Sequence, residues 1–165
     1  MTANSRTWDR LAPHLRAIIE RFQATPPVDV RGLARALGVP VKAATLPPNI
    51  SGEIRPDDED GYIIRVSRHD SLGRQRFTVA HELAHYLLHR RFIGTGITDD
   101  ALYRSNQSDA IEAEANRLAA DILMPAELVE SRKKIIERMG VENVTESLAE
   151  TFQVSPMAMT IRLEG

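Results

Sequence analysis

The sequence contains no cysteine among its 165 residues. Disulfide bonds, cysteine-ligated zinc, iron–sulfur clusters and thiol catalysis are therefore excluded, because each of them requires the sulfur atom of that residue. A metal ion in this protein would have to be bound by histidine and carboxylate side chains. Five histidines and 23 aspartates and glutamates are available as such ligands.

The sequence also lacks a strong excess of either charge and any long apolar run. Its 21 lysines and arginines give, with those acidic residues, a formal net charge of −2, which does not favour nucleic acid as the main partner. A membrane span needs about 18 consecutive apolar residues, and no such run occurs. Residues 1–9 lack the apolar core of a secretory leader. We therefore expect a cytoplasmic protein with no membrane partner.

The composition is that of a globular protein with a buried core. Hydrophobic residues make up 42% of the sequence and charged residues 27%, which are ordinary proportions for such a protein. The length fits one domain. We expect a single domain over 1–165, with its core at about 52–125 and a C-terminal helical segment at about 126–165. The expected fold class is α+β, mainly helical with a small β-sheet.

The N-terminal part of the chain has the pattern of helices. Apolar residues recur at spacings of three and four from Trp8 to Phe22, which predicts one helix that ends before Pro26. A second, short helix is expected after Asp29, which caps it, and before Gly38, where it stops. This second segment resembles half of a helix-turn-helix, but a lone half-motif packs into a core more often than it reads DNA.

A β-hairpin is expected next. Residues 51–55 and 61–66 have the composition of two strands around an acidic turn. The acidic run 57–60 does not match a calcium-binding EF-hand loop, which needs a glutamate at its twelfth position. Counted from Asp57, that position is Arg68. The run is therefore interpreted as a solvated turn.

Two stretches, 76–89 and 109–124, are the most strongly helical in the sequence, because they are rich in Ala, Leu and Glu with apolar residues at helical spacing. Residues 90–108, between them, mix Gly, Thr, Asp and Ser without a period. This pattern predicts a long loop, and a loop of that length in a compact domain often forms a lid or a substrate-binding edge.

The C-terminal segment is expected to be entirely helical. Pro125 closes the preceding helix, residues 126–139 form an amphipathic helix, and residues 144–163 contain two more. Ser155 and Pro156 are well suited to the N-cap and first position of the last helix.

The chemistry of the sequence is concentrated in His81-Glu82-Leu83-Ala84-His85, an HExxH motif. Residues four apart lie one above the other on a helix, so the two imidazoles converge on one metal ion. Glu82 lies about a quarter-turn away, close enough to take a proton from a water molecule without being a ligand. The motif therefore predicts His81 and His85 as ligands and Glu82 as the catalytic base.

A hydrolytic zinc site normally has a third protein ligand. The HExxHxxGxxH arrangement is excluded, because Leu88 and Arg91 stand where it needs Gly and His. His89 lies one more turn along the same helix face, too far along a straight helix to bind the same ion comfortably. A carboxylate from a second helix is the remaining route.

The segment from Glu112 to Asn116 supplies that carboxylate. Glu112 and Glu114 lie about 200° apart around a helix, so both cannot face the ion. Asn116 follows Glu112 by four residues on the same face, where it could hydrogen-bond a ligating histidine and fix its ring. The pattern favours Glu112 as the third ligand and leaves Glu114 as the alternative.

These residues resemble a known family. RFTVAHELAHYLLH (76–89) followed by EAEANRLAADILMP (112–125) is similar to the ImmA/IrrE family of metallo-endopeptidases, in which an HExxH helix precedes a helix of the form E-x-x-A-N/D-x-F-A-x-x-L-L-M-P. Leu118 replaces the common Phe, Ile122 replaces a Leu, and Ala84 stands where Gly is frequent, all mild apolar exchanges. The resemblance covers residues 52–125.

The resemblance implies a zincin-like domain with zinc bound by His81, His85 and Glu112. It also implies that Glu82 is the base and that the substrate is a regulatory protein, typically a DNA-binding repressor of the helix-turn-helix class. Cleavage would relieve repression after stress or during induction of a mobile element. The residue that stabilises the oxyanion is not assigned; Tyr103, Arg104 and His89 are candidates by sequence position.

Two other functions stay open. One is a DNA-binding or partner-binding module with a vestigial or structural metal site, supported by the C-terminal helix pair. Direct nucleic-acid binding is disfavoured, because the last helix has a single basic residue, Arg162, and phosphate contacts need more. The other is the toxin or regulator half of a two-gene module, which acts through its partner.

Overall fold

The computed structural model describes residues 3–94, 97–98 and 106–165. These ranges form a mainly helical α+β fold, as the sequence predicted. The helices are α1 (Arg6–Asp9), α2 (Pro13–Phe22), α3 (Val30–Ala36), α4 (Leu72–Leu88), the 3-10 helix η1 (Arg90–Phe92), α5 (Asn106–Leu123), α6 (Ala126–Arg138), α7 (Val144–Phe152) and α8 (Pro156–Glu164). The strands are β1 (Val41–Ala44), β2 (Gly52–Pro56), β3 (Tyr62–Ser67) and β4 (Ile97–Thr98).

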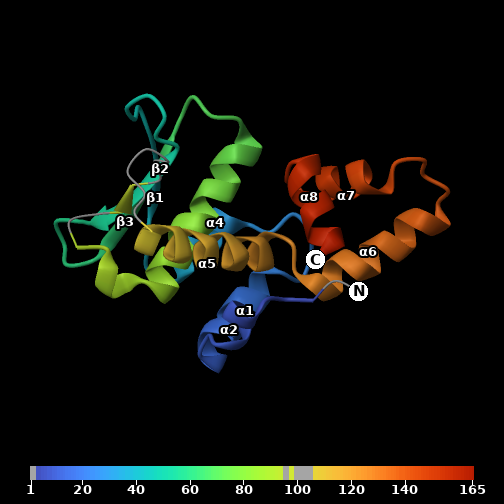
Figure 1. Cartoon of the computed structure of the whole chain (residues 1–165), viewed down its shortest axis with the longest axis horizontal. Helices are drawn as coiled ribbons and strands as arrows, with labels where there is room; N and C mark the ends of the chain where they lie inside the picture. Colours follow the sequence, from blue (N-terminus) through green and yellow to red (C-terminus); the bar gives the residue numbers. More distant parts are fainter. Residues whose placement is uncertain (1–2, 95–96, 99–105) are drawn as a thin grey trace.

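The elements are arranged around two crossing helices. Figure 1 shows the sheet on one side of α4, with α5 running across α4 and α6 to α8 at the opposite end of the molecule. Helix α8 lies beside the N-terminal segment, since Nη1 of Arg162 donates a hydrogen bond to the backbone oxygen of Ala3. None of the described helices combines the length and apolar character that a membrane span requires.

The four strands have the order β1-β3-β2-β4. The predicted hairpin is present: β2 pairs antiparallel with β3, with Ile54 opposite Ile64. Within the turn, Asp57 Oδ1 accepts hydrogen bonds from the backbone N–H groups of Glu59 and Gly61. The acidic run therefore begins with a residue that closes the turn, in agreement with its interpretation as a turn.

Two strands were not predicted. β1 pairs parallel with β3, and β4 pairs antiparallel with β2. They contain 4 and 2 residues, too few for apolar alternation to be recognised.

The expectation of one loop over 90–108 was wrong in part, because η1, β4 and the first turn of α5 fall within it. Residues 95–96 and 99–105, with Tyr103 and Arg104, lie outside the described residues, and so does most of the proposed lid.

The expectation of a single helix over residues 8–22 was wrong. Two helices form here, and the break falls at Pro13, which occupies the first position of α2. The residue before a proline is driven to extended backbone, and Ala12 has φ −58° and ψ 139°. The apolar period continues across the break, so periodicity alone did not reveal it.

Other helix ends follow their sequence signals. Asp29 accepts a hydrogen bond from Gly32 N at the start of α3, and Gly38, just after it, has φ +84°, a conformation that favours glycine. Ser155 caps α8 by accepting a hydrogen bond from Ala158 N. The helix predicted at 76–89 begins earlier, at Leu72, because Ser71 accepts a hydrogen bond from Arg74 N and caps α4 there.

β2 and α4 come unusually close at one point. A Cβ atom on Gly52 would overlap Cγ2 of Thr78 and would lie 3.0 Å from the backbone oxygen of Arg65. Only glycine fits there, because non-bonded carbon atoms stay about 3.5–4.0 Å apart. This contact sets the spacing between the sheet and the helix that carries the HExxH motif.

The core runs from one end of the fold to the other. One cluster of buried hydrophobic residues includes Trp8 of α1, Ile64 of the sheet and Met159 of α8. Where α4 and α5 pack together, both helices bury alanines completely, including Ala80 and Ala119. Small side chains let two helix backbones approach closely, which brings the side chains of the HExxH motif within reach of α5.

Candidate metal centre

The HExxH residues lie in the middle of α4 and are covered by the rest of the protein. His81 and His85 are 2% and 0% exposed. Their ring centroids are 4.8 Å apart, with the ring planes at 89° to each other. Each ring has two nitrogen atoms that need polar partners when buried.

Glu112 of α5 contacts both imidazoles. Its Oε2 atom lies 2.7 Å from Nε2 of His81, and its Oε1 atom lies 3.0 Å from Nε2 of His85. One ligand atom from each of the three side chains lies within 4.8 Å of the other two. The structure therefore brings together the two histidines and the carboxylate that the sequence favoured. We call these three residues the metal cluster.

His81 is oriented by Asn116. The Nδ1 atom of His81 lies 2.8 Å from Oδ1 of Asn116. A side-chain amide oxygen can only accept a hydrogen bond, so Nδ1–H of His81 is the donor. The Nε2 atom is then the ring nitrogen that faces Glu112 and the one that a metal ion would bind.

His85 is oriented by His89 in a similar way. The Nδ1 atoms of these two rings are 3.0 Å apart, and Nε2 of His89 lies 3.7 Å from Oε1 of Glu114. Burial, and then the neighbouring His85, lower the pKa of His89 more than Glu114 and Glu112 raise it, which favours its neutral form. With its Nε2–H toward the Glu114 carboxylate, His89 accepts the Nδ1–H of His85 and leaves Nε2 of His85 for a metal.

The electrostatics of the cluster keep its carboxylate charged. Burial by itself acts to raise the pKa of Glu112, but its close contacts with His81 and His85 outweigh burial and lower that pKa well below its ordinary value. A deprotonated carboxylate and two imidazole nitrogens are the protonation states needed for metal binding. Nε2 of His85 makes no hydrogen bond to any described residue despite its 3.0 Å approach to Glu112, as expected for an atom aimed at a ligand.

The cluster fits zinc. Two imidazole nitrogens and one carboxylate are the ligand set of a hydrolytic zinc site. With bonds of about 2.1 Å, neighbouring ligand atoms of a tetrahedral centre lie roughly 3.4 Å apart. The Glu112 oxygens lie 2.7 and 3.0 Å from the two Nε2 atoms, and no ligand atom of the cluster is more than 4.8 Å from the others, so small side-chain movements would accommodate the ion.

Glu82 lies on the same helix and is completely buried. It is not one of the three residues of the cluster. His81, His85 and Glu112 thus converge through their nitrogen and oxygen atoms, whereas Glu82, the neighbour of His81 in the sequence, is not part of that group. The same separation underlies the prediction of Glu82 as base.

Sequence reasoning missed one polar partner of the cluster. His89 was considered only as a ligand or oxyanion helper, whereas its side chain contacts a ligand candidate, His85. The signal was present, because His81, His85 and His89 repeat at the same four-residue spacing. Glu114, the alternative third ligand, lies outside the cluster and contacts His89 instead.

A buried cluster of two histidines and a glutamate on two crossing helices, packed on a small mixed sheet, defines a metallopeptidase-like domain. The chain belongs to the M78 peptidase family: the family model described as the IrrE N-terminal-like domain matches residues 34–164. This match confirms the resemblance seen in the sequence.

A solved structure has a similar fold. It is a transcriptional regulator from Mycobacterium tuberculosis, with 18% sequence identity and a TM-score of 0.58, and the match covers 96% of this chain and 51% of that one. The present chain therefore spans about half the length of that regulator. At this identity the likeness shows the fold alone. No curated protein matches the sequence.

Proposed function

We propose that this protein is a zinc-dependent endopeptidase that cuts one regulatory protein at a specific site, and that this substrate is a helix-turn-helix transcriptional repressor. The observation that carries the proposal is the convergence of His81, His85 and Glu112 on α4 and α5, with Glu82 buried beside them. We place the activity in the cytoplasm, where repressors act.

In this proposal His81, His85 and Glu112 hold the metal, and Asn116 fixes the ring of His81. Zinc bound there would polarise the carbonyl of the scissile peptide and make a water molecule more acidic. The Glu82 carboxylate accepts a proton from the attacking water and passes it to the nitrogen of the leaving amine. The position of Glu82 on the helix that carries two of the ligands supports this role, because a general base must lie within hydrogen-bond reach of the water.

The class of substrate is supported by two observations. The resemblance of the two motif helices to the ImmA/IrrE family implies a regulatory protein as substrate, and the similar solved structure is named as a transcriptional regulator. The metal-cluster side chains are also nearly inaccessible, with exposed fractions of 3%, 0% and 10%. A site so covered excludes most polypeptides, so we expect negligible cleavage of an unstructured general substrate such as casein.

The decisive experiment is incubation of the purified protein and zinc with purified helix-turn-helix repressors from the same genome, beginning with any that is encoded next to it. Mass spectrometry should show discrete repressor fragments that are absent with Glu82→Gln. Intact repressor together with rapid casein degradation would indicate a general peptidase. Binding of the repressor without cleavage, under every metal and stress condition, would favour the partner-binding module instead.

Metal content is tested separately. The purified protein should bind one zinc per chain, and His81→Ala or His85→Ala should empty the site. The control is His14→Ala, because His14 is an exposed histidine on α2. Full zinc content in either of the first two variants would eliminate the site as described.

A further inference from the structure

The last helix has an apolar face that is exposed to solvent. Met157 and Ile161 of α8 are 74% and 64% exposed. They are four residues apart and therefore lie on the same side of the helix. Exposed apolar side chains that gather on one face mark interaction sites, whereas scattered ones are ordinary.

This face borders a groove. The groove has a volume of about 660 Å³ and lies between α8, the first half of α4 and the second half of α5. Its size falls within the range of about 300–1,000 Å³ that is usual for ligand-binding clefts. The larger of its apolar lining side chains are Phe77, Met124, Val154, Met157 and Ile161.

The groove adjoins one residue of the metal cluster, His81. Phe77, which lines the groove, stacks on the ring of His81 with the ring centroids 6.2 Å apart and the planes at 30°. Asn116 also lines the groove, and it accepts the hydrogen bond from His81. Two lining residues therefore contact the same ligand candidate, and the groove adjoins the metal cluster on the Nδ1 side of His81.

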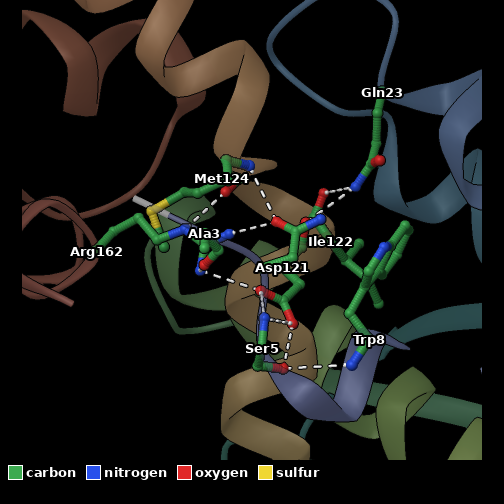
Figure 2. Close-up of polar contacts among 10 residues, drawn as sticks. Ala3, Ser5, Trp8, Gln23, Asp121, Ile122, Met124 and Arg162 are labelled. Atoms are coloured by element: carbon green, nitrogen blue, oxygen red, sulfur yellow. Dashed lines mark hydrogen bonds and ion pairs between the residues drawn. The ribbon is translucent and has the colours of Figure 1, made fainter. Parts of the chain in front are cut away.

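The far wall of the groove is held in place by Arg162. Figure 2 shows its guanidinium group against Asp121 of α5, near the N-terminal segment. Nη1 of Arg162 lies 3.0 Å from Oδ1 of Asp121, and Nε donates to the backbone oxygen of Met124. These contacts fasten α8 to the end of α5, so the groove is formed before any ligand binds.

The same contacts remove the one basic side chain of α8 from the surface. Arg162 has a side-chain exposure of only 9%. Among the described residues that line the groove, Arg74 is the one charged residue, and its guanidinium donates to Oγ of Ser51. A nucleic-acid backbone would find too few cations here. Helix α8 therefore presents an apolar face where the second helix of a DNA-binding pair would present a basic one.

We propose that this groove binds an apolar segment of the protein substrate beside the metal cluster and so determines which proteins are cleaved. This inference rests on the proposed function, because it assigns the groove to the same substrate. The two methionines of the lining suit such a role, since the flexible thioether side chain adapts to different apolar surfaces. A larger hollow of about 1030 Å³ lies along residues 46–51 and 67–74, but its lining includes neither Phe77 nor Asn116, the two groove residues that contact His81.

Methionine methyl NMR tests the groove directly. The Glu82→Gln chain, labelled with ¹³C at the methionine methyls, is titrated in the presence of zinc with a short synthetic peptide that carries Leu and Phe between Gly and Ser. We expect saturable shifts of the Met124 and Met157 signals. Met139, which is 72% exposed at the end of α6, is the internal control and should not move.

Three results of this titration would overturn the proposal. The first is that neither groove methionine shifts. The second is that Met139 shifts as much as they do. The third is that a matched peptide with Asn in place of every Leu and Phe gives the same response, since the apolar side chains would then play no part.

Substitutions separate this inference from the proposed function. Ile161→Glu should weaken peptide binding, and kcat/KM on the cleaved protein, roughly tenfold or more, because an unpaired charge would face the apolar lining. Met139→Glu is the matched control and should change neither. Groove binding without any cleavage would support the groove and contradict the peptidase function. Cleavage unaffected by Ile161→Glu, with zinc content intact, would contradict the groove alone.

Discussion

Nδ1 of His85 lies 3.0 Å from Nδ1 of His89, so the second histidine of the HExxH motif is itself held by a histidine one turn further along α4. This contact leaves only Nε2 of His85 to face Glu112. The two imidazoles of the cluster thus have separate supports, Asn116 on α5 for His81 and His89 on α4 for His85. Such supports are as important to a metal site as the ligands, because they set ring orientation and tautomer.

His89→Ala should therefore weaken zinc binding, although His89 is not in the metal cluster. Loss of a partner that orients a ligand typically costs about 10- to 100-fold in metal affinity. His89→Gln should retain more affinity, because its amide oxygen can still accept a hydrogen bond. A competition titration against a chelating dye measures both. Parent-like affinity in His89→Ala would show that His85 needs no such support.

Glu82→Gln should preserve the zinc content and the fold but abolish cleavage. An amide cannot accept the proton of the attacking water, and loss of a general base typically costs about 10² to 10⁴-fold in rate. The turnover of the repressor substrate and the zinc content should be measured on the same preparation. Cleavage at the parent rate would remove Glu82 from the mechanism.

Glu112→Ala should lower zinc affinity far more than Glu114→Ala. The Glu112 carboxylate touches both histidines of the cluster, whereas Glu114 reaches only His89 at 3.7 Å and its side chain is 34% exposed. Calorimetric titration of both variants with zinc compares them directly. If Glu114→Ala were the more damaging change, the third ligand would have been placed on the wrong side of α5.

Arg162→Met should lower the free energy of unfolding by about 3 kcal/mol, because it leaves the buried Asp121 carboxylate without its cation. Adding Asp121→Asn to this variant should restore part of that loss, since a neutral amide needs no counter-charge. Denaturant unfolding of the two single variants and the double variant gives the coupling. Additive losses would show that the two side chains do not interact.

The pH dependence of the same pair has a definite sign. Burial raises the pKa of Asp121 above 3.8, more than Ser5 and Arg162 lower it. The folded chain then binds more protons than the unfolded chain between pH 3.8 and the raised pKa, so this group makes the free energy of unfolding fall as pH rises through that window. Asp121→Asn should remove this contribution, and Arg162→Met should widen the window.

The parts of the fold with a strong local signal were predicted well. The period of three and four residues over α4, α5 and α6 located these helices, and capping residues such as Asp29 and Ser155 located helix starts. The HExxH spacing is also local, so the sequence alone could nominate His81 and His85, which lie together in the metal cluster; their role as ligands stays a prediction. Glu112 was favoured over Glu114 because it shares a helix face with Asn116.

The remaining features depend on residues that are far apart in the sequence. Asp121 accepts hydrogen bonds from Ser5, 116 positions away, and no local pattern indicates such a partner. β4 is recognisable only through its pairing with β2. The break between α1 and α2 was missed for a different reason. Pro13 occupies the first position of α2, and a proline there leaves the apolar period of the sequence unchanged. The prediction of a single domain over the whole chain stays a prediction.

At Gly52, the backbone of β2 contacts the side chain of Thr78 directly, with no side chain of β2 between the strand and α4. Elsewhere in a protein, side chains between two elements can change rotamer and absorb a small displacement, but a backbone in direct contact with a branched side chain transmits it. Thr78 lies one turn before His81 on the same helix, and β2 is hydrogen-bonded to β4. We therefore expect a displacement of the sheet at Gly52 to shift α4 at Thr78, one turn before His81.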